Sequence, residues 1–247
     1  MCMRNSSSMV RFLFVYEYPT GIAGCQEEIL LIYLEAIYWP VPVRTCSFDP
    51  GYTCLMIPQA DVSQLAWSAR LIAELDIADE RAKQLVAGLT PEQLNWRPQP
   101  GTWGVGQCLD HLCVTNEVYL PAISGSLRDK PVSPVENITL GWFARWFITS
   151  FIEPSPKTKR ARAPKKIVPS VHVEPSVLDR FLRSNHAARE LIRQAGNYDV
   201  NRIRFKNPLL RVLRFTVGTG LEIVSRHEQR HLLQAERTKQ ASGFPGP

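Results

Sequence analysis

Two histidines near the end of the 247-residue chain have the spacing of a metal-binding pair. His227 and His231 lie in residues 221–238, a stretch without Pro or Gly that is rich in helix-favouring Leu, Glu, Arg and Gln. On a helix, residues four apart share a face, with Cβ atoms roughly 5–6 Å apart. The two imidazoles can therefore reach one metal ion. The arginines of this stretch fall mostly on other faces, which predicts that the histidines occupy the less charged, inward side.

Residues 227–231 also spell HExxH, the motif of zinc peptidases in which the glutamate is the general base. One class of these enzymes needs Gly and His three and six residues after the second histidine, where this chain has Gln234 and Arg237. Another class needs a carboxylate further on, and Glu236 is the only one in the last 16 residues. Glu228 also lies about 100° around the helix from the first histidine, which argues against its acting as base. A zincin-type metallopeptidase is thus the weaker alternative, and a third ligand has to come from upstream.

Four segments carry apolar residues at helical spacing, and we predict that they form an all-α, antiparallel four-helix bundle with long crossover loops. The first starts at a cap supplied by Asp61 or Ser63 and ends near Gly88. The others span about 104–123, from the cap Ser176 to about 196, and 221–238. A break at residues 218–220, with Thr219 as a possible cap, is predicted to precede the last helix.

The second of these helices carries the upstream candidate. His111 falls on its apolar face, three residues after Cys108 and four before Thr115. His172 has no metal partner in the sequence, and we interpret His186 as a surface or packing residue.

The combined pattern resembles the DinB-like, or YfiT-like, superfamily of four-helix bundles. The resemblance rests on the turn Trp96-x-Pro98-x-Pro100-Gly-Thr-Trp103 before a helix with Gln107 and His111-Leu112, on His227-x-x-x-His231-x-x-Gln234, and on the order and spacing of the helices. It covers roughly residues 62–239, within a predicted bundle domain of residues 56–241. In that family a histidine of the second helix joins two of the last helix on a divalent metal. By matching position, the resemblance implies the ligands His111, His227 and His231.

The chain departs from the family pattern at the start of the second helix. The family usually has Ser as N-cap and Glu three residues later, where this chain has Gly104 and Gln107. Glycine is a tolerable cap and glutamine can still reach back to the backbone, so we expect a weakened helix start and an unchanged metal triad.

Three histidines without a fourth protein ligand are typical of a catalytic metal site with one open position. Cys108 is an alternative fourth ligand. Imidazole suits zinc, nickel, iron or copper, and we favour zinc or nickel. The resemblance implies hydrolysis, or transfer of a low-molecular-weight thiol, on a small-molecule substrate. Gln234 could orient a ligand or water, which leaves Gln234 and Glu228 as the candidate catalytic residues. A bundle that only binds metal or a small ligand is the alternative function.

Composition restricts the partners of the protein. A 45% hydrophobic and 21% charged chain is typical of soluble globular proteins. The net charge of +6 and the six basic residues in 157–166 come without interleaved aromatics, which argues against a nucleic-acid-binding or DNA-associated protein. Six cysteines without a CxxC motif favour reduced thiols in a cytoplasmic protein, and no apolar run is long enough for a membrane span. The aromatic residues 141–152 are predicted to plug one end of the bundle, with a substrate-pocket wall or a homodimer contact as alternatives.

Residues 1–55 lack the periodicity of the rest and are predicted to be an atypical, poorly structured N-terminal extension or an artefact of the gene start. A chain that starts at Met56 should therefore stay folded and bind metal. Thermal unfolding monitored by circular dichroism tests this, because a cooperative transition should persist. Aggregation or a non-cooperative transition would show that the extension belongs to the core.

Overall fold

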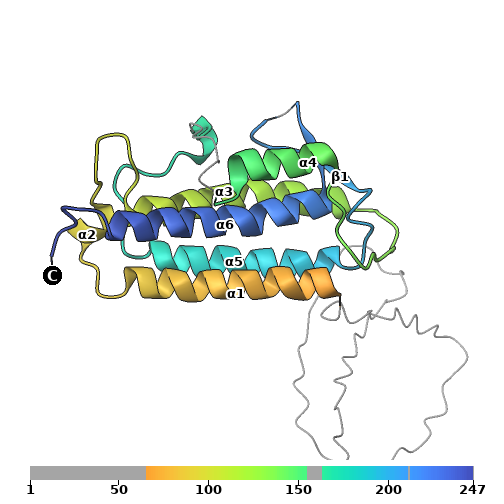
Figure 1. The fold of residues 1–247 in the computed structure, drawn as a ribbon. Helices are drawn as coiled ribbons and strands as arrows, with labels where there is room; N and C mark the ends of the chain where they lie inside the picture. Colours follow the sequence, from red (N-terminus) through yellow and green to blue (C-terminus); the bar gives the residue numbers. More distant parts are fainter. Residues whose placement is uncertain (1–64, 155–162, 211, 247) are drawn as a thin grey trace, which may run out of the picture. The chain divides into compact units, whose positions relative to one another are not determined.

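The computed structural model describes residues 65–154, 163–210 and 212–246, so the predicted extension at 1–55 lies outside the described residues. Within them, four long helices form a bundle (Figure 1). They are α1 (Ala66–Val86), α3 (Val105–Leu127), α5 (Val177–Ala195) and α6 (Val217–Lys239). Helices α1 and α6 run in one direction and α3 and α5 in the other, with a long crossover between α3 and α5. The predicted all-α, antiparallel four-helix bundle is confirmed.

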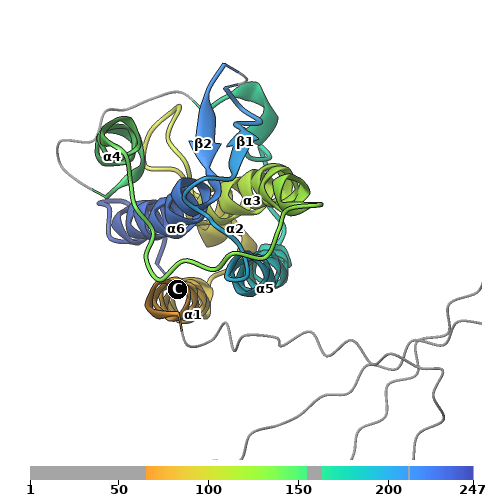
Figure 2. The ribbon, with the colours of Figure 1, turned by 90° about the vertical axis from the view of Figure 1, so that its right-hand side faces the viewer.

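Seen end-on, each long helix packs against two others (Figure 2). Both α1 and α3 contact α5 and α6. No helix of the described residues is long and apolar enough to cross a membrane.

Shorter elements fill the connections. They are α2 (Pro91–Asn95), α4 (Trp142–Phe147), the π-helix η2 (Ile148–Ile152), the 3₁₀-helix η3 (Lys165–Ile167), and the strands β1 (Arg204–Lys206) and β2 (Arg214–Thr216). The strands pair antiparallel, with Phe205 opposite Phe215, and lie outside the bundle against α3 and α6 (Figure 2). This hairpin was not predicted. Helices α4 and η2 form the aromatic segment, but it lies beside α6 on the outside of the bundle rather than plugging an end (Figure 2), and Trp142 and Trp146 are exposed.

The turn before α3 explains the glycine at position 104. The Gln107 side-chain oxygen accepts a hydrogen bond from the Gly104 N–H at 3.1 Å, as predicted for a glutamine at this position. A Cβ at residue 104 would lie 2.6 Å from the carbonyl oxygen of Trp96, closer than any real contact. A serine at this position would therefore require the backbone of the turn to shift.

The predicted caps of α1, Asp61 and Ser63, lie outside the described residues. Ser176 directly precedes α5, as predicted, but its side chain makes no capping hydrogen bond. The break predicted at residues 218–220 is absent, because α6 starts at Val217 and Thr216 caps it by accepting a hydrogen bond from the Thr219 N–H.

The glycines that suggested a break are instead contact points inside α6. A Cβ on Gly218 would lie 3.0 Å from Ile138, and a Cβ on Gly220 would lie 2.7 Å from the Phe205 ring. These positions let the hairpin and the preceding loop approach the helix backbone closely.

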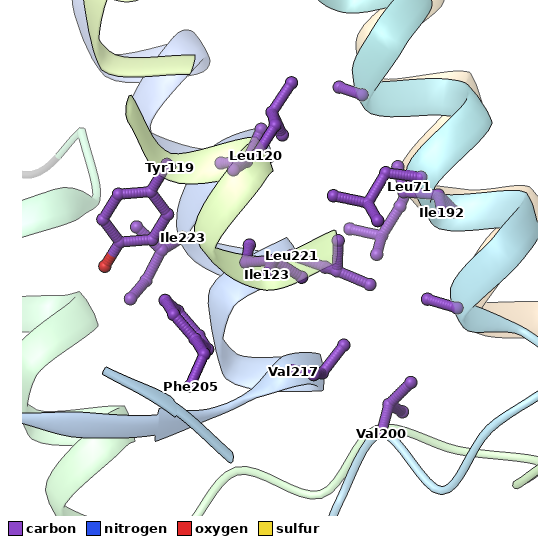
Figure 3. Packing of buried hydrophobic residues seen from close by; sticks show 14 of the residues in the cluster. Leu71, Tyr119, Leu120, Ile123, Ile192, Val200, Phe205, Val217, Leu221 and Ile223 are labelled. Carbon is purple, nitrogen blue, oxygen red and sulfur yellow. The ribbon is translucent and has the colours of Figure 1, made fainter. Parts of the chain in front are cut away.

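Two apolar clusters fill the bundle, one at each end. The cluster beside the hairpin includes Leu71, Ile123, Phe205 and Leu221, and Figure 3 shows Phe205 reaching in toward Tyr119 and Ile223. The cluster at the other end includes the fully buried Leu109, Phe181 and Leu232.

Between the clusters, each long helix contributes one buried polar residue to a polar layer: Asp79, Asn116, Asn185 and Glu228. The Asn185 amide donates to the carboxylates of Asp79 and Glu228, and the Asn116 amide donates to Glu228. The middle of the bundle is therefore held by hydrogen bonds rather than by apolar packing.

Gly220→Ala should destabilise the protein by about 1–3 kcal/mol, because the added methyl group overlaps the Phe205 ring and the helix-propensity gain does not offset this. Gly125→Ala is the matched control in α3, since nothing lies within 4 Å of its added Cβ. That change should be neutral or stabilising. Urea unfolding of both variants gives the free energies, and equal effects would contradict the proposed close contact.

Candidate metal centre

The structure brings the three predicted histidines together between α3 and α6. His111 comes from α3, and His227 and His231 come from successive turns of α6. The Nε2 atom of His227 lies 3.3 Å from that of His111 and 3.1 Å from that of His231. Among the described residues, this is the one group of three or more His, Cys, Asp or Glu side chains whose donor atoms all lie within 4.8 Å of one another.

Two of the three rings are oriented through their other nitrogen. The Nδ1 atom of His111 lies 2.6 Å from the carbonyl oxygen of Ile167 in η3, and Nδ1 of His231 lies 3.0 Å from the side-chain oxygen of Gln234. Both partners are acceptors, so each Nδ1 carries the proton and donates it. The Nε2 atoms of His111 and His231 are consequently unprotonated, and their lone pairs face the shared space.

This arrangement fits a divalent metal ion. Zinc–nitrogen bonds of about 2.0–2.1 Å at tetrahedral angles separate ligand nitrogens by roughly 3.3–3.4 Å, close to the two measured separations. Without a cation, one proton on His227 could satisfy only one of the two lone pairs that face it. A shared cation satisfies all three nitrogens, and hydrogen bonding of the remote nitrogen is the usual support of a metal-bound histidine.

Burial keeps the imidazoles neutral. His111 and His231 are buried and His227 is half-buried. Burial lowers the pKa of His111 to about 4, although its hydrogen bond to Ile167 opposes the shift. Burial and the neighbouring histidines lower the pKa of His227 and His231 well below the usual range. Neutral imidazole is the form that binds metal.

Trp103 and the crossover cover the site. The Trp103 ring lies 4.6 Å from the His111 ring and 5.6 Å from the His231 ring, measured between centroids. The Gln107 amide donates to the carbonyl of Ser170, and the Ser170 N–H donates to the carboxylate of Asp110. These bonds fix the crossover against α3 and hold the Ile167 carbonyl over His111.

Glu228 lies in the polar layer, apart from the three ligand nitrogens. Its two carboxylate oxygens accept hydrogen bonds from Asn116 and Asn185 at 3.2 and 3.0 Å. Burial, the main cause, raises its pKa to about 8. The inward side of α6 is thus occupied by Glu228, whereas the histidines face α3 and the crossover. The HExxH residues do not form the arrangement of a peptidase centre.

The other candidate ligands do not join the group. Cys108 is buried in the apolar cluster that includes Leu109 and Phe181, and burial raises its pKa far above the usual range. His172 and His186 are exposed, as the sequence indicated for His186. Gln234 contacts His231 directly, so in the structure it orients a histidine.

Three residues that lie next to the histidines were not predicted to belong to the site. The Ile167 carbonyl carries no side-chain signal and is placed by the crossover alone. Trp103 was predicted only to belong to the turn before the second helix, not to contact the histidines. Arg230 was placed on another face, although its charge adds to the lowering of the pKa of His111 by burial. The i,i+3 relation of Arg230 to His227 was the signal that could have found it.

Comparisons with known proteins match the chain to one family model and to two proteins of Bacillus subtilis. The sequence model of the DinB superfamily matches residues 74–235, which include all three histidines. The uncharacterized protein YuaE of Bacillus subtilis (strain 168) is 24% identical in an alignment of 163 residues that covers 62% of this chain and 87% of YuaE. Among solved structures, YfiT from Bacillus subtilis is described as a probable metal-dependent hydrolase with an unusual four-helix bundle topology. It aligns with a TM-score of 0.47 and 17% identity over 72% of this chain and 89% of YfiT.

The metal-free protein should lose stability in acid through these histidines. In the unfolded chain a histidine has a pKa of about 6.5, whereas that of folded His111 is about 4. Below pH 6.5 the unfolded state therefore binds a proton that the folded state does not, and the free energy of unfolding falls as the pH drops. For one histidine the loss is about 1 kcal/mol by pH 5.5.

Urea unfolding in EDTA between pH 7 and pH 5 measures this loss. His111→Gln should reduce the loss by about 1 kcal/mol, because only the contribution of His111 disappears, whereas the exposed control His172→Gln should leave the loss unchanged. An equal slope in His111→Gln and the unaltered protein would contradict the assigned neutral state.

Proposed function

Because this chain belongs to the DinB superfamily and its fold brings three neutral imidazoles together, we propose that it is a metal-dependent enzyme that acts on a small molecule. His111, His227 and His231 would hold one divalent ion. The observation that carries the proposal is the convergence of three histidine Nε2 atoms. In two of these rings, His111 and His231, the Nδ1 proton is donated to the Ile167 carbonyl and to the Gln234 side chain. Zinc or nickel suits this all-imidazole donor set, and iron is the alternative.

The reaction we propose is hydrolysis or the transfer of a low-molecular-weight thiol to an electrophile. A divalent ion held by His111, His227 and His231 with one position left open would lower the pKa of a coordinated water or thiol toward neutrality. Neither reaction needs a carboxylate ligand from the protein.

The residues around the site have distinct roles in this proposal. Trp103 excludes water from one side of the histidines, and the Ile167 carbonyl fixes the tautomer of His111. Gln234 is a positioning residue that fixes the tautomer of His231. Glu228 supports the bundle interior and is not the base, because both of its oxygens are occupied by amides of α3 and α5.

His231→Ala should abolish metal retention and leave the helix content nearly unchanged. Changes of residues that only orient a ligand cost about 10–100-fold in metal affinity, so the loss of a ligand should exceed about 100-fold. The helices are held by their apolar clusters, which this change does not touch. Metal analysis of protein purified without a histidine tag, together with circular dichroism, checks both expectations.

Glu228→Gln is the paired variant, and it should retain one metal ion per chain and most of the turnover. Turnover is measured with an activated ester and with a small thiol plus an electrophilic aryl halide. A peptidase-type centre would lose orders of magnitude in rate on loss of its general base. Retained metal with complete loss of activity in Glu228→Gln would therefore refute the assigned roles.

A further inference from the structure

Arg230 is a half-buried cation beside the histidine triad. It lies three residues after His227 and directly before His231 on α6. One guanidinium nitrogen donates to the carbonyl oxygen of Phe151 in η2 at 3.0 Å. Its charge is close enough to add to the effect of burial in lowering the pKa of all three histidines.

Among the described residues, no carboxylate forms an ion pair with Arg230. Arg226, one turn earlier, shows the contrast, because it pairs with both Glu153 and Glu222. Burial alone lowers the pKa of Arg230, with no acidic neighbour to oppose it. Residues 155–162 add no Asp or Glu to the sequence nearby.

A guanidinium has five N–H donors, and the Phe151 carbonyl accepts only one of them. Holding a partly desolvated cation without a counter-charge costs free energy. An incoming anion would remove this cost. His227 and Arg230 are both half-buried, whereas His111 and His231 are buried, so the histidine that is partly open to solvent is the one three residues before Arg230.

We propose that Arg230 binds an anionic group, such as a carboxylate or phosphate, on the small molecule that occupies the open position of the site. The inference rests on the proposed metal-dependent function and narrows its substrate class to anions. Arg230 is the specificity-determining residue, because its planar fork pairs with a carboxylate or phosphate through two parallel hydrogen bonds.

The alternative is a purely structural role, in which Arg230 only anchors η2 to α6 through Phe151. A structural anchor would be indifferent to the charge of a ligand. Binding of matched charged and neutral ligands therefore separates the two roles.

The test uses the full-length protein loaded with Co²⁺, whose thiolate charge-transfer absorption reports ligand binding. The probes are 3-mercaptopropionate and its amide, and 4-mercaptobutyrate and its amide, which differ in charge at two tether lengths. The unaltered protein should bind the acid of at least one pair about tenfold or more tightly than its amide, as a charge-assisted hydrogen bond provides.

Arg230→Gln should reduce this preference about tenfold, to the part that the charge of the metal ion alone supplies, while leaving the affinity for the amides unchanged. Arg230→Lys should restore part of it, and Arg237→Gln, an exposed arginine on the same helix, should behave like the unaltered protein. If Arg230→Gln does not fold, the test uses two other results. They are the preference of the unaltered protein for the acid over the amide and the reduction of that preference in Arg230→Lys.

Each outcome has one meaning. Equal affinity for acid and amide in the unaltered protein, or an undiminished preference in Arg230→Gln, would overturn the role of Arg230 and leave the metal site standing. Failure of the unaltered protein to bind Co²⁺ would overturn the proposed function and this inference with it.

Discussion

Three imidazole nitrogens can share one small space only if their protons are held somewhere else. In this protein the proton of His111 is held by a backbone carbonyl of the crossover and that of His231 by Gln234 on the next turn. The first of these bonds spans 56 residues and depends on the path of the whole connection between α3 and α5. Gln107, Asp110 and Ser170 fix that path. The long crossover is therefore part of the site.

Helix α6 has a histidine face and a second face that carries Glu228. The histidines face α3 and the crossover, while Glu228 enters the polar layer between the apolar clusters. A turn of α6 about its axis would move Glu228 into apolar surroundings and the histidines away from α3. Because a buried polar group without partners costs about 1–3 kcal/mol, the polar layer opposes such a turn. The hydrogen bonds of Glu228 thus set the orientation in which the histidines meet.

The periodic features of the sequence predicted much of this structure. The four helices follow from apolar spacing, and the meeting of His111 with the pair on α6 followed from the turn and helix motifs taken together. Features without a periodic signal were missed. The hairpin strands have three residues each, too few for alternation to stand out. Gly218 and Gly220 suggested a break because a local rule cannot register that Ile138 and Phe205 pack on them. The ligand roles and the start of the domain at residue 56 stay predictions.

No carboxylate belongs to the proposed ligand group or pairs with Arg230 among the described residues. A metal centre with a carboxylate ligand loses one unit of positive charge to the protein, but three neutral histidines remove none. Glu228, the nearest acid in sequence, does not compensate, because its carboxyl is hydrogen-bonded in the polar layer, where burial raises its pKa to about 8. Arg230 adds a further positive charge with no acidic partner among the described residues. Since charges interact more strongly where water is excluded, a metal ion held in the proposed way would favour negative charge on whatever the site binds. The same excess of positive charge would stabilise hydroxide or thiolate over the neutral water or thiol, so in this proposal substrate selection and activation of the nucleophile arise from one arrangement of residues.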